Sequence, residues 1–129
     1  MSSLNSANLR GAKLDHADLS DADLDDANLH ITDLRGADLR NASLNAADLH
    51  GADLSGADLS DAKLYSADLS RADLSDTILR GADLCEADLC DADLFEANFE
   101  NAQVLKKLYA YLSNKNVKNL NKTIIVDDE

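Results

Sequence analysis

Leucine recurs at every fifth position along most of this chain. The series runs without a gap over residues 4–94, and two other large apolar residues extend it to residue 104. Alanine stands two positions before each of these residues over residues 7–102, except at Thr32 and Thr77. One five-residue pattern of apolar and polar positions therefore governs about four fifths of the sequence.

Neither regular backbone structure buries side chains at this spacing. On an α-helix, a step of five residues advances about 140° beyond a full turn, so the leucines would scatter around the axis. On a flat strand, leucines five residues apart would point to opposite faces in turn. A chain that bends at the same point of every repeat buries all of them. The pattern therefore predicts short extended segments separated by two-residue corners.

The glycines mark the second position of each predicted corner. All five follow a leucine by two positions, and Asp, Asn and Ser fill most of the equivalent positions elsewhere. Glycine tolerates positive φ, and short polar side chains bond the local backbone, so these residues favour turns. If the repeats stack as a solenoid, each short strand pairs with the strands one coil above and below it. We then expect leucine to stack on leucine in a continuous core.

The sequence A-[D/N]-L-x-x, present about twenty times in residues 2–104, resembles the pentapeptide repeat family. The resemblance implies a right-handed quadrilateral β-helix with four repeats in each coil, and hence about five coils. We therefore expect an all-β solenoid whose β-helix spans residues 1–104. Residues 105–129 are expected to form a short C-terminal α-helical cap and a tail.

The two ends of the solenoid are predicted to differ. At the C-terminal end, four apolar residues have the spacing of an amphipathic helix: Leu105, Leu108, Tyr109 and Leu112. Asn101 is the expected N-cap of this helix. This helix would cover the last coil. The first coil has no such cover of its own, so we expect a second copy of the chain, or the tail, to shield its leucines.

The tail contains a β-branched apolar run, Thr-Ile-Ile-Val, at residues 123–126. Such a run favours a strand. Two placements fit the sequence: a strand or turn against the chain's own cap, or a strand added to another molecule.

The charge of the chain narrows the choice of partners. The net charge is −13, with an acidic body over residues 1–104 and a weakly basic tail. We therefore expect no direct binding to nucleic acid or to a membrane surface. The two cysteines, the lack of a signal-like N-terminus and the lack of a long apolar run favour a cytoplasmic location.

Residues twenty positions apart would stack along the outside of such a solenoid. One column then contains Arg10, His30, His50, Ser70 and Cys90. Stacked imidazoles could hold a divalent metal, which makes His30 and His50 the candidate ligands. A third ligand is missing nearby, so we expect no metal and no cofactor.

Aspartates stack in the same way, in columns such as Asp33, Asp53, Asp73 and Asp93. Neighbouring carboxylates at this spacing repel by about 1 kcal/mol in water. We expect hydrogen bonds from backbone N–H groups at the corners to offset this repulsion. A ladder of bound cations or an acidic docking face is the alternative.

Four large apolar residues break the polar pattern of the predicted outer surface: Ile31, Tyr65, Ile78 and Phe95. Exposed apolar patches mark contact sites, so these are the candidate interaction residues. Short corners without inserted loops leave no place for a catalytic cleft. We therefore expect no catalytic residues and no small-molecule substrate.

The expected function is a non-catalytic protein–protein interaction or scaffold module that presents an acidic rod. Its partner would be another protein, or the chain itself through the uncapped N-terminal coil. The family resemblance offers an alternative, because some pentapeptide repeat proteins resemble DNA and inhibit type II topoisomerases such as gyrase. Five arginines on the body argue against this mimicry: Arg10, Arg35, Arg40, Arg71 and Arg80.

Overall fold

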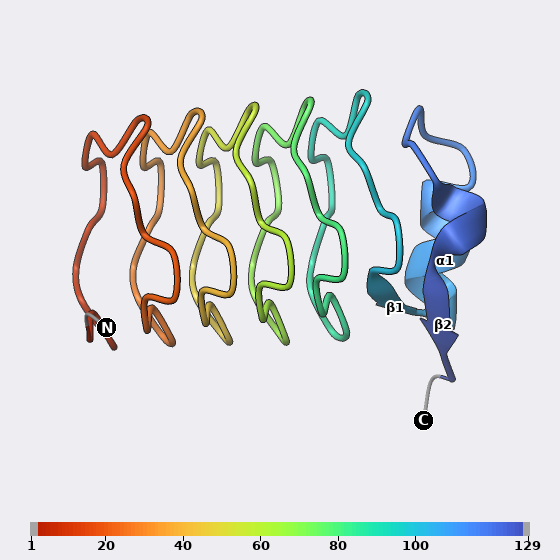
Figure 1. Ribbon diagram of the computed structural model, residues 1–129, viewed down its shortest axis with the longest axis horizontal. Helices are drawn as coiled ribbons and strands as arrows, with labels where there is room; N and C mark the ends of the chain where they lie inside the picture. The colour runs from red at the N-terminus through yellow and green to blue at the C-terminus, as the bar shows by residue number, and fades with distance from the viewer. Residues whose placement is uncertain (1–2, 128–129) are drawn as a thin grey trace.

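The computed structural model describes residues 3–127 and shows a stack of coils that a helix closes at one end (Figure 1). Parallel bridges join Ser3, Asn8, Lys13 and Asp18 to the residues twenty positions later, and the same spacing continues along the stack. Each coil therefore contains twenty residues and has four sides, with one bridge position on each side. Backbone hydrogen bonds between successive coils hold the stack together.

Each corner is a two-residue turn whose second residue has positive φ. After Leu19, for example, Asp21 has a φ of 62° and the N–H of Ala22 donates to the Leu19 carbonyl at 3.1 Å. A type II β-turn has this hydrogen bond and needs positive φ at its third residue. All five glycines occupy this position, with φ between 63° and 71°. The predicted role of glycine at the corners is confirmed.

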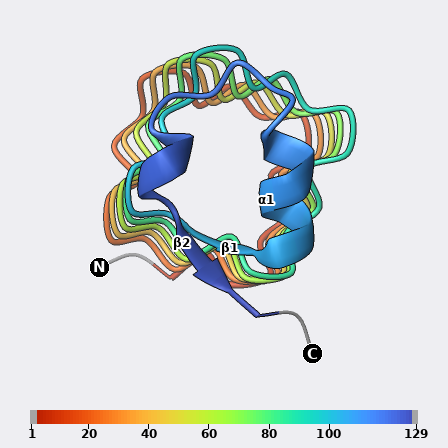
Figure 2. The same ribbon diagram turned by 90° about the vertical axis from the view of Figure 1, so that its right-hand side faces the viewer.

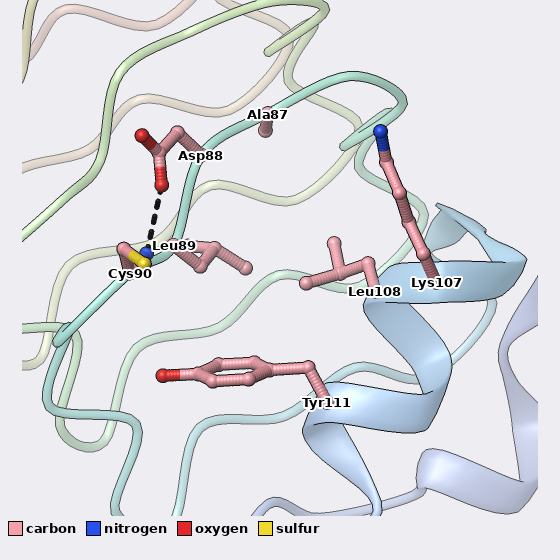
Figure 3. A pocket seen from close by; sticks show the side chains of 7 residues that line it. All are labelled: Ala87, Asp88, Leu89, Cys90, Lys107, Leu108 and Tyr111. Atoms are coloured by element: carbon pink, nitrogen blue, oxygen red, sulfur yellow. Dashed lines mark hydrogen bonds between the residues drawn. The ribbon is translucent and has the colours of Figure 1, made fainter.

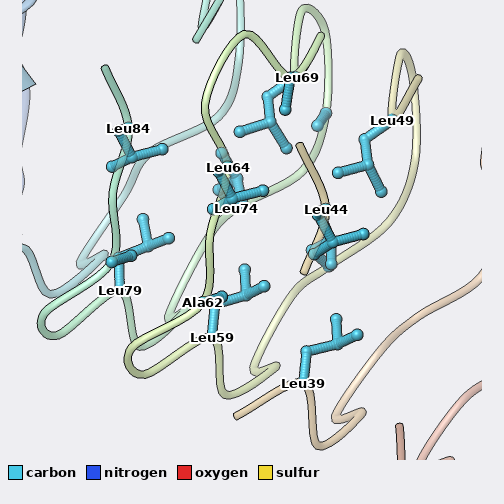
Figure 4. Packing of buried hydrophobic residues seen from close by; sticks show 14 of the residues in the cluster. Leu39, Leu44, Leu49, Leu59, Ala62, Leu64, Leu69, Leu74, Leu79 and Leu84 are labelled. Atoms are coloured by element: carbon cyan, nitrogen blue, oxygen red, sulfur yellow. The ribbon is translucent and has the colours of Figure 1, made fainter. Parts of the chain in front are cut away.

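Leucine and alanine fill the interior of the stack. The repeat leucines of residues 24–84 are 0% exposed and stack on one another along the axis (Figure 4). Thr32 and Thr77 replace alanine and are also buried. Their hydroxyls donate to the carbonyls of Leu9 at 3.0 Å and Leu54 at 2.9 Å. These bonds satisfy the hydroxyls of the two buried threonines.

The elements after the last coil are β1 (Gln103–Leu105), α1 (Lys106–Leu112), η1 (Leu120–Lys122) and β2 (Ile124–Val126). The predicted cap helix is present as α1, and it buries Leu108 and Leu112 against the end of the stack. The longest helix within residues 3–127 is thus seven residues long, and no helix there has the length and hydropathy of a membrane span.

The predicted start of the cap helix is wrong. Its N-cap is Leu105, not Asn101, and it has no side-chain hydrogen bond. Gln103 still belongs to the ladder, because its N–H donates to Ala82 and its carbonyl accepts from Leu84, both at 2.8 Å. These bonds keep the chain extended through β1. The boundary expected between residues 104 and 105 therefore lies inside this strand.

The tail lies against the C-terminal end of its own chain. Lys118 pairs with Asn98 of the last coil, and β2 then pairs in parallel with β1. Figure 2 shows α1, η1 and β2 together over the end of the stack. Of the two placements that the sequence left open, the strand against the chain's own end is confirmed. The tail therefore does not shield the first coil.

Candidate functional site

The outer surface carries carboxylates whose positions are fixed by the corners. At each aspartate in a bridge position, one carboxylate oxygen accepts the backbone N–H two residues later, as Asp53 does from Ser55 at 3.0 Å and Asp88 from Cys90 at 2.9 Å. The same bond forms at Asp18, Asp23, Asp33, Asp38, Asp48, Asp58, Asp68, Asp73, Asp83 and Asp93. The expected backbone bonds are confirmed, and they hold the stacked acids in place.

The acidic charge is concentrated in one coil. Residues 81–100 contain seven acidic and no basic residues, whereas residues 1–20 contain two of each. Two lysines after the coil offset part of this charge, with Lys107 at 4.0 Å from Glu86 and Lys118 at 3.1 Å from Glu96. Three further acids of this coil are exposed and form no ion pair among residues 3–127: Asp88, Asp91 and Asp93.

Two arginines of the body are paired with aspartates of their own coil. The Arg35 guanidinium is 2.7 Å from Asp33, and the Arg40 guanidinium is 2.6 Å from Asp38. The hydrogen bond from the Arg35 side chain lowers the pKa of Asp33 to about 2, and Arg40 lowers the pKa of Asp38 in the same way. These two cations therefore neutralise acids of their own coil.

The four candidate interaction residues are exposed but do not form one patch. Ile31, Tyr65 and Phe95 are 51%, 50% and 54% exposed, and they lie at three different corners of the coils. Ile78 is 38% exposed and lies on the side that follows the corner of Phe95. Ile78 thus lies on one side of the solenoid and Phe95 lies at the edge of that side, whereas Ile31 and Tyr65 lie at other corners.

We define the acidic patch as Asp88, Asp91, Asp93 and Phe95. These residues occupy two successive sides and corners of the last full coil. Asp93 also accepts the backbone N–H of Phe95 at 3.1 Å, and this bond fixes the backbone at the corner that carries the aromatic ring. The patch combines exposed negative charge with one exposed aromatic ring, which suits a basic protein surface.

Two exposed apolar residues were not predicted from the sequence. Ile124 and Ile125 in β2 are 50% and 47% exposed. Their β-branched run signalled a strand. Their exposure follows from the position of β2, which pairs with β1 at the end of the stack.

The two stacked histidines are bonded to other side chains. The Arg10 guanidinium lies 2.7 Å from Nδ1 of His30, and Nδ1 of His50 lies 2.8 Å from Oγ of Ser70. The two rings meet edge to face with centroids 5.1 Å apart. The predicted stacking is present, but within residues 3–127 no three His, Cys, Asp or Glu residues cluster as metal ligands. His30 and His50 thus link successive coils.

A recess of about 270 Å³ lies between α1 and the last coil. Leu89 and Leu108 point toward one another, with the ring of Tyr111 beside them (Figure 3). The recess exists because α1 leaves the path of the repeat, so that no strand among residues 3–127 covers Leu89. This volume lies just below the range of about 300–1,000 Å³ that is usual for ligand sites.

The two cysteines carry free thiols. Burial, followed by the hydrogen bond with Asp83, raises the pKa of Cys85 to about 11. A thiol with this pKa stays protonated at neutral pH, and the protonated form is a poor nucleophile. Cys90 lies at the rim of the recess described above.

The repeats match the family model for pentapeptide repeats in eight copies, over residues 2–41, 42–81 and 74–104. The chain belongs to the pentapeptide repeat family. Pentapeptide repeat proteins are generally non-catalytic structural or interaction modules, and membership implies a right-handed quadrilateral β-helix.

Solved structures of pentapeptide repeat proteins resemble this chain. A pentapeptide repeat protein from the thylakoid lumen of Arabidopsis thaliana is 31% identical, with a TM-score of 0.62 over 80% of this chain and 75% of its own. QnrB1, a plasmid-mediated fluoroquinolone resistance protein, is 16% identical, with a TM-score of 0.50 over 98% of this chain and 80% of its own. The second likeness shows the fold alone. No similar sequence was found among curated proteins.

Proposed function

We propose that this pentapeptide repeat protein is a non-catalytic interaction module whose acidic patch binds a basic surface of another protein. The observation that carries the proposal is the charge of residues 81–100, where seven acidic residues stand without a basic one. Exposed acids of this coil lie beside an exposed phenylalanine. Aromatic side chains supply much of the binding energy in protein interfaces, and charge complementarity guides the encounter.

The rigidity of the coil supports binding by this patch. Asp88 and Asp93 each accept a backbone N–H at their corner, at 2.9 and 3.1 Å. Side chains that are already ordered lose little conformational entropy when a partner binds. Two of the three carboxylates of the patch, those of Asp88 and Asp93, are therefore already held in place before a partner binds.

The test neutralises the patch without removing its corner bonds. The triple variant Asp88→Asn, Asp91→Asn and Asp93→Asn keeps a side-chain oxygen at each position and removes three charges. Affinity capture from a lysate should return a discrete partner with the parent chain, and this variant should lose it. Raising the salt concentration should also release the partner, because salt screens exposed charges.

The matched control removes three charges from another coil. Asp48→Asn and Asp58→Asn change residues that bond their corners as Asp88 and Asp93 do, and Asp61→Asn changes a corner residue equivalent to Asp91. This control should retain the partner, whereas Phe95→Ser should weaken its binding. Equal loss of the partner from both triple variants would show that net charge, rather than the patch, drives capture, and would contradict the proposal.

A second candidate is a DNA mimic that inhibits a type II topoisomerase such as gyrase. The observation that favours it is the net charge of −13 on a rod in which Arg35 and Arg40 are neutralised by their own aspartates. The test is a supercoiling assay with purified gyrase and micromolar protein. Inhibition by the parent chain would support mimicry, and unchanged supercoiling would exclude it.

A further inference from the structure

The N-terminal coil, residues 3–22, is an open end of the hydrophobic core. Its four leucines are partly exposed, whereas the repeat leucines directly above them are 0% exposed. The C-terminal end differs, because α1 and the tail cover it (Figure 1). Within residues 3–127, nothing covers the N-terminal face in this way.

The backbone of this coil also presents an unpaired ladder edge. In the second coil, Asn28 donates its N–H to Ala7 at 2.9 Å and accepts from Leu9 at 2.8 Å, so both of its backbone groups point toward the N-terminal end. The equivalent residues of the first coil have the same orientation: Asn8, Lys13 and Asp18. Their backbone groups make no such bond to another of residues 3–127.

The same coil differs from the rest of the body in charge. Residues 1–20 contain two acidic and two basic residues, Asp15, Asp18, Arg10 and Lys13. Each of the four later coils has more acidic than basic residues. Two N-terminal coils can therefore approach one another without the repulsion that two acidic coils would experience.

We propose that the N-terminal coil binds the same coil of a second copy, head to head, around a two-fold axis perpendicular to the stack. Strands that meet across such an axis run antiparallel. In an antiparallel pair, two opposed residues exchange both N–H···O=C bonds when both backbone groups of each face the partner. The residues of this edge have that arrangement, so the second copy continues the ladder and covers the leucines.

The climb of the coil selects one register. A four-sided coil allows four two-fold axes, two through the sides and two through the corners. Along the solenoid axis, each side of the coil lies about a quarter of the roughly 4.8 Å ladder spacing above the side before it, so the four sides of the open end lie at different heights. The four sides of this coil contain, in chain order, Ser3, Asn8, Lys13 and Asp18. Only one axis gives the same distance between the two copies on all four sides, and it pairs the first side with the fourth and the second with the third.

This register places Asn8 opposite Lys13 of the second copy, and Ser3 opposite its Asp18. No like charges are opposed. The neighbouring inward residues also fit, because Leu9 then faces Ala12 of the second copy and Ala7 faces its Leu14. Large residues opposite small ones allow the two cores to interdigitate.

The experiment measures the dimer by sedimentation velocity over a concentration series of the full chain. Asn8→Asp keeps the side-chain oxygen that accepts the N–H of Arg10 at 3.2 Å, and it places an acid opposite Lys13 of the second copy. Two such pairs form per dimer, so the dimerisation Kd should fall by roughly threefold to tenfold. The control Asn28→Asp adds the same charge one coil away from the interface and should not tighten the dimer.

A second background tests the register itself. In a chain that already carries Lys13→Asp, the substitution Asn8→Asp places an acid at position 8 opposite the acid at position 13 of the second copy. Asn8→Asp should therefore weaken the dimer in this background. General charge repulsion cannot produce this reversal of sign. A weaker dimer with Asn8→Asp in the parent background, or no change in Kd, would assign a different register and overturn the one proposed. A chain that stays monomeric up to millimolar concentration would overturn the proposal as a whole.

Small-angle scattering of the parent dimer gives an independent check. End-to-end association should lengthen the particle along one axis without widening its cross-section. A dimer with the length of one chain and a doubled cross-section would contradict head-to-head binding.

Discussion

Each corner places one residue in the left-handed region of φ, and the chemistry of that residue sets the local strain. Ile31 has a φ of 52° there and is the one β-branched residue among the positions of positive φ in residues 3–127. The left-handed region costs an ordinary L-residue about 1–2 kcal/mol, while Asn and Gly tolerate it better. The sequence thus accepts strain at Ile31 and leaves the side chain 51% exposed.

Replacing Ile31 by asparagine should stabilise the protein. We expect Ile31→Asn to raise the free energy of unfolding by about 1 kcal/mol, because the strain at the corner is relieved and little apolar burial is lost. Urea denaturation followed by circular dichroism measures the change. Ile31→Val keeps the branched side chain and should give no gain. A less stable Ile31→Asn protein would show that the isoleucine makes a compensating contact.

The pair of Asp33 and Arg35 gives a pH-dependent prediction. The Arg35 side chain holds the pKa of Asp33 at about 2, below its ordinary value of 3.8. The charged form is favoured in the folded state, so its contribution to stability is present above pH 4 and is lost as the pH falls toward 2. Arg35→Gln should return the pKa of Asp33 toward 3.8 in an NMR titration.

The matched control for this titration is Arg71→Gln. Arg71 forms no ion pair within residues 3–127, so its loss should leave the pKa of Asp33 in place. An unchanged pKa of Asp33 in the Arg35→Gln protein would show that another group, rather than Arg35, stabilises the carboxylate.

At the scale of the elements, the end of the repeat is decided by competition between the ladder and helix α1. Apolar spacing predicted a helix near residues 101–116, but the ladder continues through β1. α1 then begins where the chain no longer pairs with the coil below. It packs Leu108 and Leu112 over the stack, with exposed fractions of 9% and 0%.

Truncation of Leu112 should therefore destabilise the C-terminal end. We expect Leu112→Ala to lower the free energy of unfolding by about 2–4 kcal/mol, since it removes a fully buried side chain. Lys106→Ala changes an exposed residue of the same helix and should alter stability by less than about 0.5 kcal/mol. Equal stability of the two variants in urea denaturation would show that α1 does not act as a cap.

At the scale of the whole molecule, the repeated part was predictable from sequence because every repeat buries its apolar residues and turns its corner in the same way. The position of Leu24, the corner at Asp21 and the corner bond of Asp53 all follow from one five-residue pattern. The end of the chain has no such pattern, so the start of α1 and the exposure of Ile124 were not predicted. The placement of Ile78 beside the corner of Phe95 depends on the twenty-residue coil, which the five-residue periodicity alone does not supply.

The stacked acids oppose the stability of the whole rod, and one column allows this to be measured. Asp73 lies between Asp53 and Asp93, and its Oδ1 accepts the N–H of Ser75 at 3.0 Å. Asp73→Asn keeps this acceptor and removes two like-charge contacts, so it should raise the free energy of unfolding by about 1–2 kcal/mol at low salt. Asp73→Ala removes the same contacts but also loses the corner bond, so it should be less stable than Asp73→Asn by about 1–2 kcal/mol.

Salt separates the two effects. Because the repulsion between exposed carboxylates is screened as ionic strength rises, the advantage of Asp73→Asn should vanish near molar salt. The deficit of Asp73→Ala relative to Asp73→Asn should remain, since it comes from a local hydrogen bond. Thermal denaturation of the parent and both variants across a salt series measures this. An advantage of Asp73→Asn that does not depend on salt would show that the gain does not come from repulsion between the stacked carboxylates.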